Sequence, residues 1–327
     1  MSVQVNTMVN MDQRSLRGSA LKGLGHYQPA NIVTNDDLAR RVETNDEWIR
    51  TRTGIRERRI ASESETVVDM ASAAARMALE DARIDDVSLV VVASTTLMDR
   101  SPNSAARVSA ELGLSGPAVL DINTACSGFE YALALADQAI SMGTAEHALV
   151  IGAEKLSGVT DWTDRRTCVL TADGAGAVVL GPSPEPTISP VVWGSVPEML
   201  EAVVIDKETQ LFSQDGRSVM RWVLTEAADQ AKRVLDRAGL TPADIDVFAF
   251  HQANLRLLEP LARALGVTDK QVLIRDIEES GNTSAASVPL GLSKAWHRGE
   301  LPRGGRAFLF GFGGGFTFAG QVVTLPN

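Results

Sequence analysis

The order of apolar and polar positions along the chain predicts buried strands that alternate with amphipathic helices. Four short runs of apolar residues have strand length and no polar alternation, which is typical of strands covered on both faces. These runs are residues 89–93, 148–152, 177–180 and 247–250. Longer stretches with helical spacing lie between and after them, at residues 67–82, 105–112, 128–142, 218–238, 257–265 and 288–297. Such alternation predicts an α/β protein with helix-covered sheets.

A weak internal repeat suggests two similar halves. Two segments of the first half are similar to two segments that follow, in the same order, roughly 155 residues later. The matching pairs are 111–114 with 264–267, and 121–122 with 276–277. The alternative is chance similarity between amphipathic helices. The Pro-rich segment 182–190 lies between the two repeats and is typical of a linker.

Composition is that of an ordinary soluble protein. The chain has 44% hydrophobic and 22% charged residues, which excludes a disordered protein. A net charge of -10 disfavours a general nucleic-acid binder, although it leaves room for a local basic patch. The N-terminus lacks the apolar segment of a signal peptide. No apolar run approaches the ~20 residues that a membrane-spanning helix needs. The chain has only two cysteines, which cannot form a disulfide framework. We therefore expect a soluble cytoplasmic protein.

The first candidate for chemistry is Cys126. It follows a strand-like segment and a tight turn of small residues, and a helical run begins at the cysteine. A thiol there lies near the positive end of the helix and its free N–H groups, so we expect its thiolate form to be favoured. The alternative is a buried structural cysteine, which is our interpretation of Cys168.

The second candidate is His251. It directly follows the apolar strand 247–250, and the end of a strand is a common catalytic position in α/β folds. The other three histidines, His26, His147 and His297, occur in polar or loop-like contexts and are predicted at the surface.

A polar cluster over residues 280–287 corresponds in the repeat to the segment that carries Cys126. Asn282 would therefore enter the same crevice, where its amide can donate hydrogen bonds to a developing oxyanion. The alternative is a helix cap and tight turn before residue 288. Residues 311–316 are rich in glycine without the spacing of a dinucleotide fingerprint, so we interpret them as a close backbone approach that offers N–H groups to an oxyanion.

Together, a thiol, a histidine, an amide and a glycine loop predict acyl transfer through a thioester. The sequence shows no metal-ligand cluster, no phosphate-binding Gly-Lys-Ser/Thr loop and no serine-hydrolase motif. The residue types alone do not separate condensation from hydrolysis.

These segments, taken in order, resemble the β-ketoacyl-acyl carrier protein synthase III family, the initiating condensing enzymes of the thiolase superfamily. The resemblance runs from about Ser19 to the end of the chain. Its motifs are residues 46–49 with 51–55, 125–129, 173–177, 251–254, 281–287 and 311–316.

The resemblance implies an α/β thiolase-like fold of five layers, α/β/α/β/α, made of two duplicated halves and working as a homodimer. It divides the chain into an N-terminal extension over residues 1–18, a half with the nucleophile over 19–182, and a half with the histidine and asparagine over 183–327.

The resemblance also implies a mechanism. Cys126 would take an acyl group from acyl-CoA, and the enolate formed when malonyl-acyl carrier protein loses CO2 would attack that thioester. His251 and Asn282 would stabilise the enolate, and the backbone N–H groups of Cys126 and Gly314 would hold the oxyanion of the acyl group. Neither a cofactor nor a metal is implied. The product would initiate fatty-acid or polyketide synthesis, or a related specialised pathway.

Further positions match the family's binding sites for CoA and pantetheine. Trp48 would stack on the adenine, Arg52 and Arg165 would face the nucleotide, and Asn254 would contact the pantetheine arm.

One position matches a docking site for the carrier protein. Arg256 resembles the family's docking arginine, and Arg217, Arg221 and Arg263 would extend a basic patch for the acidic carrier protein. For the arginines of this patch, a plain solvated surface charge is the alternative.

Four departures from the family suggest a different primer pocket. Around the cysteine, Thr124-Ala125 and Ser127 stand where the family more often has an all-small Ala/Gly pair. The loop Ser101, Pro102 and Asn103, at the place where the family completes the acyl pocket of the partner subunit, is more polar than usual. Residues 171–172 differ from the usual Phe-Gly pair. Residues 194–214 form a shorter stretch than is typical.

Three other functions stay open at this stage. The first is an acyltransferase of the same fold that uses an alcohol or amine acceptor, which the presence of both His251 and Asn282 disfavours. The second is a non-catalytic partner subunit, which Cys126 disfavours. The third is a thiol hydrolase, which would need water in a tunnel that excludes it.

Overall fold

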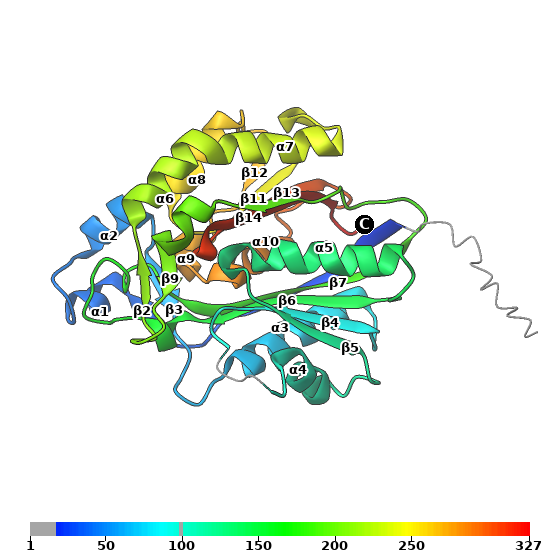
Figure 1. The fold of residues 1–327 in the computed structure, drawn as a ribbon, viewed down its shortest axis with the longest axis horizontal. Coiled ribbons are helices and arrows are strands. Elements are labelled where there is room, and N and C mark those ends of the chain that lie inside the picture. Colours follow the sequence, from blue (N-terminus) through cyan, green and yellow to red (C-terminus); the bar gives the residue numbers. More distant parts are fainter. Residues whose placement is uncertain (1–17, 98–100) are drawn as a thin grey trace, which may run out of the picture.

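The protein has five layers in which two sheets alternate with helices (Figure 1). The computed structural model describes residues 18–97 and 101–327, so residues 1–17 of the expected N-terminal extension lie outside the described residues. Helices α5 (Gly128–Ser141) and α10 (Ser287–His297) lie between the sheets. The predicted α/β/α/β/α fold is confirmed.

The first sheet has the strand order β1-β7-β6-β4-β5. Its strands are β1 (Gly18–Tyr27), β4 (Leu89–Ala93), β5 (Ala118–Ile122), β6 (Ala148–Lys155) and β7 (Asp173–Ser183). Strand β4 pairs in parallel with β5 and β6, whereas β7 pairs antiparallel with β6 and β1. Strand β5 therefore forms one edge of the sheet.

The second sheet repeats that arrangement in the order β12-β11-β13-β14-β8. Its strands are β8 (Val192–Ser195), β11 (Val247–Phe250), β12 (Val272–Leu273), β13 (Arg306–Gly313) and β14 (Thr317–Thr324). Strand β11 is parallel to β12 and β13, and β14 is antiparallel to β13 and β8. Each strand thus has a counterpart of the same direction in the first sheet. The expected boundary between the halves, after residue 182, falls at the end of β7, before β8 begins.

Outer helices cover the exposed face of each sheet. Helices α3 (Val67–Ala82) and α4 (Ser104–Leu112) cover the first sheet, and α6 (Gly216–Trp222), α7 (Ala228–Ala238) and α8 (Leu255–Ala264) cover the second. The single helix predicted over residues 218–238 contains a π-helical turn, Val223–Ala227, between α6 and α7.

Helix α3 shows why the local sequence selects a helix. Thr66 and Asp69 form a capping box, in which each side chain accepts the backbone N–H of the other residue. Small residues at helical spacing then bury one face, including Ala71, Ala74 and Ala78, so the helix packs closely on the sheet. The predicted bounds of this helix are confirmed.

Short elements complete the fold around the sheets. They are α1 (Asn35–Ala39), α2 (Asp46–Thr53), α9 (Ile277–Ser280), the strand pair β2 (Ile32–Thr34) and β3 (Glu57–Arg59), and the hairpin β9 (Val203–Ile205) with β10 (Phe212–Gln214). Two 3-10 turns, η1 (Ala125–Ser127) and η6 (Ser284–Ala286), begin the two central helices, and a third, η7 (Gly314–Phe316), joins β13 to β14.

The two halves have different cores. The cluster under α3 consists mainly of Ala and Val side chains, whereas the cluster under α7 and α8 contains Trp222 and seven phenylalanines. Burying one such aromatic side chain contributes roughly 1.5–3 kcal/mol.

Two minor predictions have clear outcomes. Cys168 is fully buried in an apolar cluster, as predicted for a core residue. His26, predicted at the surface, instead lies half-buried in β1, where its Nδ1 is 2.9 Å from the Ser293 hydroxyl. Burial lowers the pKa of His26 to about 4. None of the helices in the described part of the chain has the length and apolar character needed to cross a membrane.

Candidate active site

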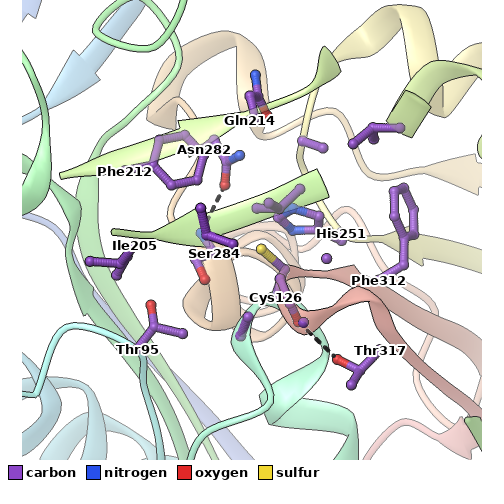
Figure 2. A pocket seen from close by; sticks show the side chains of 18 of the residues that line it. Thr95, Cys126, Ile205, Phe212, Gln214, His251, Asn282, Ser284, Phe312 and Thr317 are labelled. Atoms are coloured by element: carbon purple, nitrogen blue, oxygen red, sulfur yellow. Dashed lines mark hydrogen bonds between the residues drawn. The ribbon is translucent and has the colours of Figure 1, made fainter. Parts of the chain in front are cut away.

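A cavity of about 530 Å³ lies where segments of the two halves meet, and it brings Cys126, His251 and Asn282 together (Figure 2). Its walls come from the turns η1, η6 and η7, the end of β13, the residues just after β11, and the hairpin β9–β10, with further residues from α6 and α8. Three residues that are distant in the sequence, one from the first half and two from the second, therefore share one pocket.

Cys126 is held by a tight turn. Ala125 before it adopts a left-handed conformation, with φ of 48°, and the Thr317 hydroxyl donates a hydrogen bond to the carbonyl of Thr124 at 3.0 Å. Strand β13 approaches the cysteine so closely that a Cβ atom at Gly313 would lie 2.7 Å from the Cys126 sulfur. Only glycine fits at position 313 without displacing the thiol.

The thiol of Cys126 is neutral in the resting site. Burial raises its pKa to about 11, and hydrogen bonds from Ser284 and from the backbone N–H groups of Gly314 and Cys126 only partly offset this effect. The expectation that the helix start favours the thiolate is therefore wrong for the resting site, because loss of hydration outweighs the helix end. Thiolate formation needs a proton acceptor nearby.

His251 directly follows β11 and is buried. Its Nδ1 is 2.8 Å from the Ser287 hydroxyl, which also accepts the N–H of Gln252 at 3.2 Å. The only acceptor among these contacts for the hydroxyl proton of Ser287 is Nδ1 of His251. The imidazole proton is therefore on Nε2, and this nitrogen is the one that faces the pocket. Burial lowers the pKa of His251 to about 3, and the edge of its ring packs against Phe312 at a centroid distance of 5.8 Å. The imidazole is thus a neutral hydrogen-bond donor.

The amide of Asn282 is also oriented. Its Oδ1 accepts the backbone N–H of Ser284 at 2.8 Å, and this contact leaves the NH2 group available to the pocket. His251 and Asn282 therefore both present N–H groups to the cavity. Two fixed donors of this kind are suited to an oxygen that gains negative charge.

Gly314 directly follows β13 and begins η7, where it packs against Ala125 of the turn that carries the cysteine. Its backbone N–H points toward Cys126, and so does the N–H of Cys126 itself. Both lie in the pocket lining. The two N–H groups predicted to form an oxyanion hole are therefore adjacent in space.

The predicted nucleotide residues form a separate cluster. The guanidinium carbons of Arg52 and Arg165 lie 5.7 and 5.2 Å from the ring centre of Trp48. Trp48, on α2, packs on the same apolar cluster as Leu255, and the preceding residue, Asn254, lines the pocket and caps α8. The aromatic cluster thus lies on the Asn254 side of the pocket.

The predicted docking arginines are exposed around the pocket. Arg256 is two residues beyond the pocket-lining Asn254, Arg263 follows on the same helix, and Arg221 is next to the pocket-lining Met220 on α6. Their side chains are free to meet a partner surface.

Loop residues Ser101, Pro102 and Asn103 do not contribute to the pocket lining of the described chain. Asn103 caps α4, and the next two backbone N–H groups, of Ser104 and Ala105, donate to Asp121 on β5 at 2.8 Å each. The loop is therefore anchored beside the edge strand of the first sheet.

Sequence reasoning missed part of the site. The hairpin wall contributes Ile205, Phe212 and Gln214, and its strands are too short to show a pattern. Glu154, which contacts the pocket-lining Thr95, had a signal in the sequence: it is an acidic residue that directly follows six apolar positions of a strand.

No group of three or more potential metal ligands occurs within residues 18–97 and 101–327. The side chains around the pocket are instead a thiol, an imidazole and amides.

Comparison with known proteins places these features in a family. The sequence model of 3-oxoacyl-[acyl-carrier-protein] synthase III matches residues 120–197, and the model of its C-terminal part matches residues 235–325. The chain is 55% identical over 315 residues to beta-ketoacyl-[acyl-carrier-protein] synthase III 4 of Streptomyces coelicolor, covering 95% of this chain and 99% of the relative. It is 53% identical over 316 residues to synthase III 2 of Streptomyces avermitilis, covering 95% and 100%.

A solved structure agrees with these matches. The priming β-ketosynthase from the R1128 polyketide biosynthetic pathway superimposes with a TM-score of 0.92 at 39% identity, covering 95% of this chain and 97% of that one. Because identity of this level extends over nearly the whole chain, the likeness concerns more than the fold. The chain belongs to the β-ketoacyl-acyl carrier protein synthase III family of condensing transferases.

Proposed function

We propose that this protein condenses an acyl primer with a malonyl unit carried by acyl carrier protein, and so initiates fatty-acid or polyketide synthesis. The observation that carries the proposal is the meeting of one nucleophile and two fixed neutral donors, Cys126, His251 and Asn282, in a single pocket. A condensing enzyme needs this set, because it must form a thioester and then stabilise an enolate beside it.

In the first half-reaction, the sulfur of Cys126 attacks the thioester carbonyl of an acyl-CoA and releases CoA. The backbone N–H groups of Cys126 and Gly314 hold the oxyanion of the tetrahedral intermediate. Their position beside the sulfur supports this role. Removing one such donor typically slows a reaction by about 10²–10³-fold.

In the second half-reaction, malonyl-acyl carrier protein loses CO2 and its enolate attacks the acyl group on Cys126. His251 and Asn282 donate hydrogen bonds to the enolate oxygen. The neutral state of His251 supports this assignment, because a neutral imidazole with its proton on Nε2 donates without first losing a charge. No step uses a cofactor.

We assign the CoA moiety of the primer to Trp48, Arg52, Arg165 and Asn254. Two guanidinium groups already stack near the indole ring, an arrangement that suits an adenine with its phosphates. Asn254 links this cluster to the pocket and would contact the pantetheine arm.

We assign carrier docking to the exposed arginines Arg256, Arg221 and Arg263 near the pocket. The whole chain has a net charge of -10, so a local positive surface is what would attract an acidic carrier.

We propose that two copies of the chain form a dimer through the edge strand β5. Its residues Val119 and Leu120 are 37% and 42% exposed, which is unusual for an apolar edge strand without a partner. The loop 101–103 is anchored to β5 through Asp121, so pairing of two β5 strands would bring this loop toward the pocket of the other copy. We also assign the protein to the cytoplasm, where its free cysteines would stay reduced.

The primer is proposed to differ from that of enzymes that start ordinary fatty-acid synthesis. The polar loop 101–103 and the amide of Gln214 in the pocket wall support this difference. Primer profiling tests it, and a clean preference for acetyl-CoA would contradict it.

The deciding experiment is intact-protein mass spectrometry after incubation with a panel of acyl-CoAs, for wild type and Cys126→Ala, followed by malonyl-acyl carrier protein. We expect an adduct that depends on Cys126 and is discharged to a β-ketoacyl-carrier product. Discharge only by an alcohol or amine would make the protein an acyltransferase without condensation, and no adduct with any thioester would overturn the proposal.

A further inference from the structure

Asn282 is held in the pocket by a short segment of the first half. It lies between α9 and η6, outside the helices and strands, and its backbone forms an isolated parallel bridge with Thr171. The N–H of Asn282 donates to the carbonyl of Leu170 at 2.8 Å, and its carbonyl accepts the N–H of Ala172 at 2.9 Å. The place from which the Asn282 side chain reaches into the pocket (Figure 2) therefore depends on segment 169–172.

A buried arginine holds that segment. Arg58, the middle residue of β3, is 0% exposed. Its Nη2 donates to the carbonyl of Val169 at 2.9 Å. Its Nη1 donates to Oδ1 of Asn35 at 2.8 Å and to the carbonyl of Val33 at 3.2 Å. The two ends of one planar guanidinium thus join segment 169–172 to the β2–β3 pair.

The aliphatic stem of the same arginine lies against the residue before Asn282. Gly281 has a φ of 69°, and a Cβ atom there would lie 3.0 Å from Cβ of Arg58 and 3.3 Å from the carbonyl oxygen of Leu170. Arg58 therefore contacts both strands of the bridge that carries Asn282: segment 169–172 through its guanidinium and Gly281 through its stem.

The other side of the guanidinium has a fixed support. Asn35 is 1% exposed, and its Nδ2 donates at 2.8 Å both to the carbonyl of Ile55 and to the carboxylate of Asp46, the first residue of α2. The amide of Asn35 is thus oriented by three contacts, one of them with Arg58. The position of Arg58 is therefore defined from both sides.

The chemistry of this contact favours precise placement over plain filling of the core. Burial lowers the pKa of Arg58 to about 10, so the guanidinium is still charged at neutral pH. Its three hydrogen-bond acceptors are neutral oxygens, and burying a charge against them costs more than burying an apolar side chain of similar size. In return, a charged donor makes strong hydrogen bonds, and its planar fork fixes two directions at once.

We propose that Arg58 is a positioning residue for Asn282 and thereby serves the condensation half-reaction; this role rests on the function proposed above. Arg58 does not line the pocket of the described chain, so it acts through Asn282. It fixes segment 169–172 and Gly281, and these fix the direction in which the Asn282 amide donates to the enolate oxygen. The turn of Cys126 is held by Thr317 instead, so acylation does not depend on Arg58.

The test compares the two half-reactions in one protein preparation. Mass spectrometry follows acylation of Cys126 by the best acyl-CoA, and then the discharge of the acyl adduct after malonyl-acyl carrier protein is added. A general loss of folded protein would affect both steps alike. A misplaced Asn282 slows discharge alone, so the ratio of the two rate constants separates positioning from a merely structural role.

Two substitutions of Arg58 are expected to give a graded effect. Arg58→Lys should slow discharge about tenfold and Arg58→Met about 10²-fold, while acylation stays within about twofold of wild type. The ammonium of a lysine is a single point charge that cannot span the two sides joined by the guanidinium, and methionine fills the space without a donor. If Arg58→Met does not fold, Arg58→Lys decides the question.

Arg56→Met is the matched control. Arg56 lies two residues earlier in the chain, has a side chain that is 58% exposed, and pairs with Glu278 at 2.7 Å. Its replacement removes an arginine from the same segment without touching segment 169–172. Both rate constants should stay at their wild-type values.

A double variant tests whether Arg58 acts through Asn282. Asn282→Ala should slow discharge about 10²–10³-fold, because it removes a donor to the enolate oxygen. Adding Arg58→Lys to Asn282→Ala should slow discharge by no more than about twofold further, because both changes affect the same donor.

Three results would overturn the assignment: an equal slowing of acylation and discharge in Arg58→Lys, an unchanged discharge in the Arg58 variants, or losses that multiply in the double variant. A wild-type protein that forms no Cys126 adduct, or whose adduct malonyl-acyl carrier protein cannot discharge, would instead count against the proposed function.

Discussion

The two halves of the molecule contain the same turn and use it differently. In the first half, Thr124 and Ala125 lead into η1 and then α5; in the second, Thr283 and Ser284 lead into η6 and then α10. The left-handed residue has a φ of 48° in both. The next residue is the proposed nucleophile, Cys126, in the first half and an alanine in the second. The left-handed residue of the turn therefore has the same backbone conformation in both halves, and the side chains of the two turns differ.

The strand ends beside these turns show the same division. Ser94 follows β4 and His251 follows β11, at matching places in the two sheets. The neighbouring central strand places Glu154 beside Ser94 and Phe312 beside His251. The comparison teaches that matching places in the two sheets hold groups of different chemistry: a buried carboxylate with its hydroxyl donors in the first, and a neutral imidazole against an aromatic edge in the second.

The largest expected effect comes from moving the nucleophile between the two turns. Cys126→Ala should slow acylation by at least about 10³-fold, and adding Ala285→Cys should not restore it, because residue 285 is buried and is not part of the pocket lining of the described chain. Mass spectrometry of the acyl adduct measures this. An adduct at position 285 of the double variant would mean that the two turns are chemically equivalent.

The second prediction compares the two cores at one strand of each sheet. Phe308→Ala on β13 should lower the free energy of unfolding by about 3–5 kcal/mol, whereas Val92→Ala on β4, in the cluster under α3, should lower it by about 2 kcal/mol, since it removes a smaller buried group. Urea unfolding followed by circular dichroism measures both. Equal losses would contradict the difference between the aromatic and aliphatic cores.

The third prediction concerns the contact between Gly313, at the end of β13 in the second half, and Cys126 in the first half. Gly313→Ala should slow acylation about 10²-fold, because its methyl group would lie 2.7 Å from the Cys126 sulfur and displace it. Gly158→Ala is the control, because a Cβ there meets no atom of the described residues within 4 Å. An unchanged rate in Gly313→Ala would show that the thiol has room to move.

The smallest expected effect is a dependence of stability on pH that comes from His251. The residue at the matching strand end of the first half, Ser94, does not titrate. Burial lowers the pKa of His251 to about 3, so below pH 6.5 the unfolded chain binds the proton more strongly and stability falls with falling pH. From pH 7 to pH 5 this group should account for about 2 kcal/mol.

The measurement is urea unfolding of wild type and His251→Asn at pH 7 and pH 5. The variant should lose about 2 kcal/mol less than wild type over this interval, since its amide does not titrate. The same fall in both proteins would place the pH dependence elsewhere.

Much of the fold could be predicted because its elements have strong local patterns. Helix α3 has a capping box and a small-residue face, and strands β4 and β11 are short aliphatic or aromatic runs, so their bounds agree with the sequence. The internal repeat also indicated that Asn282 would meet Cys126, and the structure places both in one pocket.

The rest depends on contacts between distant residues. The donors of the buried Glu154 carboxylate are Ser94, Thr95 and Thr96, roughly 60 residues away, and no local pattern encodes those contacts. The thiol of Cys126 shows the same limit. Its position at a helix start is local, but its pKa follows from burial by both halves.

The hairpin β9–β10 has a consequence for how this enzyme type diversifies. It forms a two-stranded sheet of its own, separate from the two large sheets of the described chain, and still supplies Ile205, Phe212 and Gln214 to the pocket wall. Replacement of residues 203–214 would break no hydrogen bond of the two large ladders. A change of this hairpin would therefore alter the shape of the pocket while the two sheets keep Cys126, His251 and Asn282 in place. We expect residues 203–214 to be the part of the pocket that is easiest to vary or to redesign.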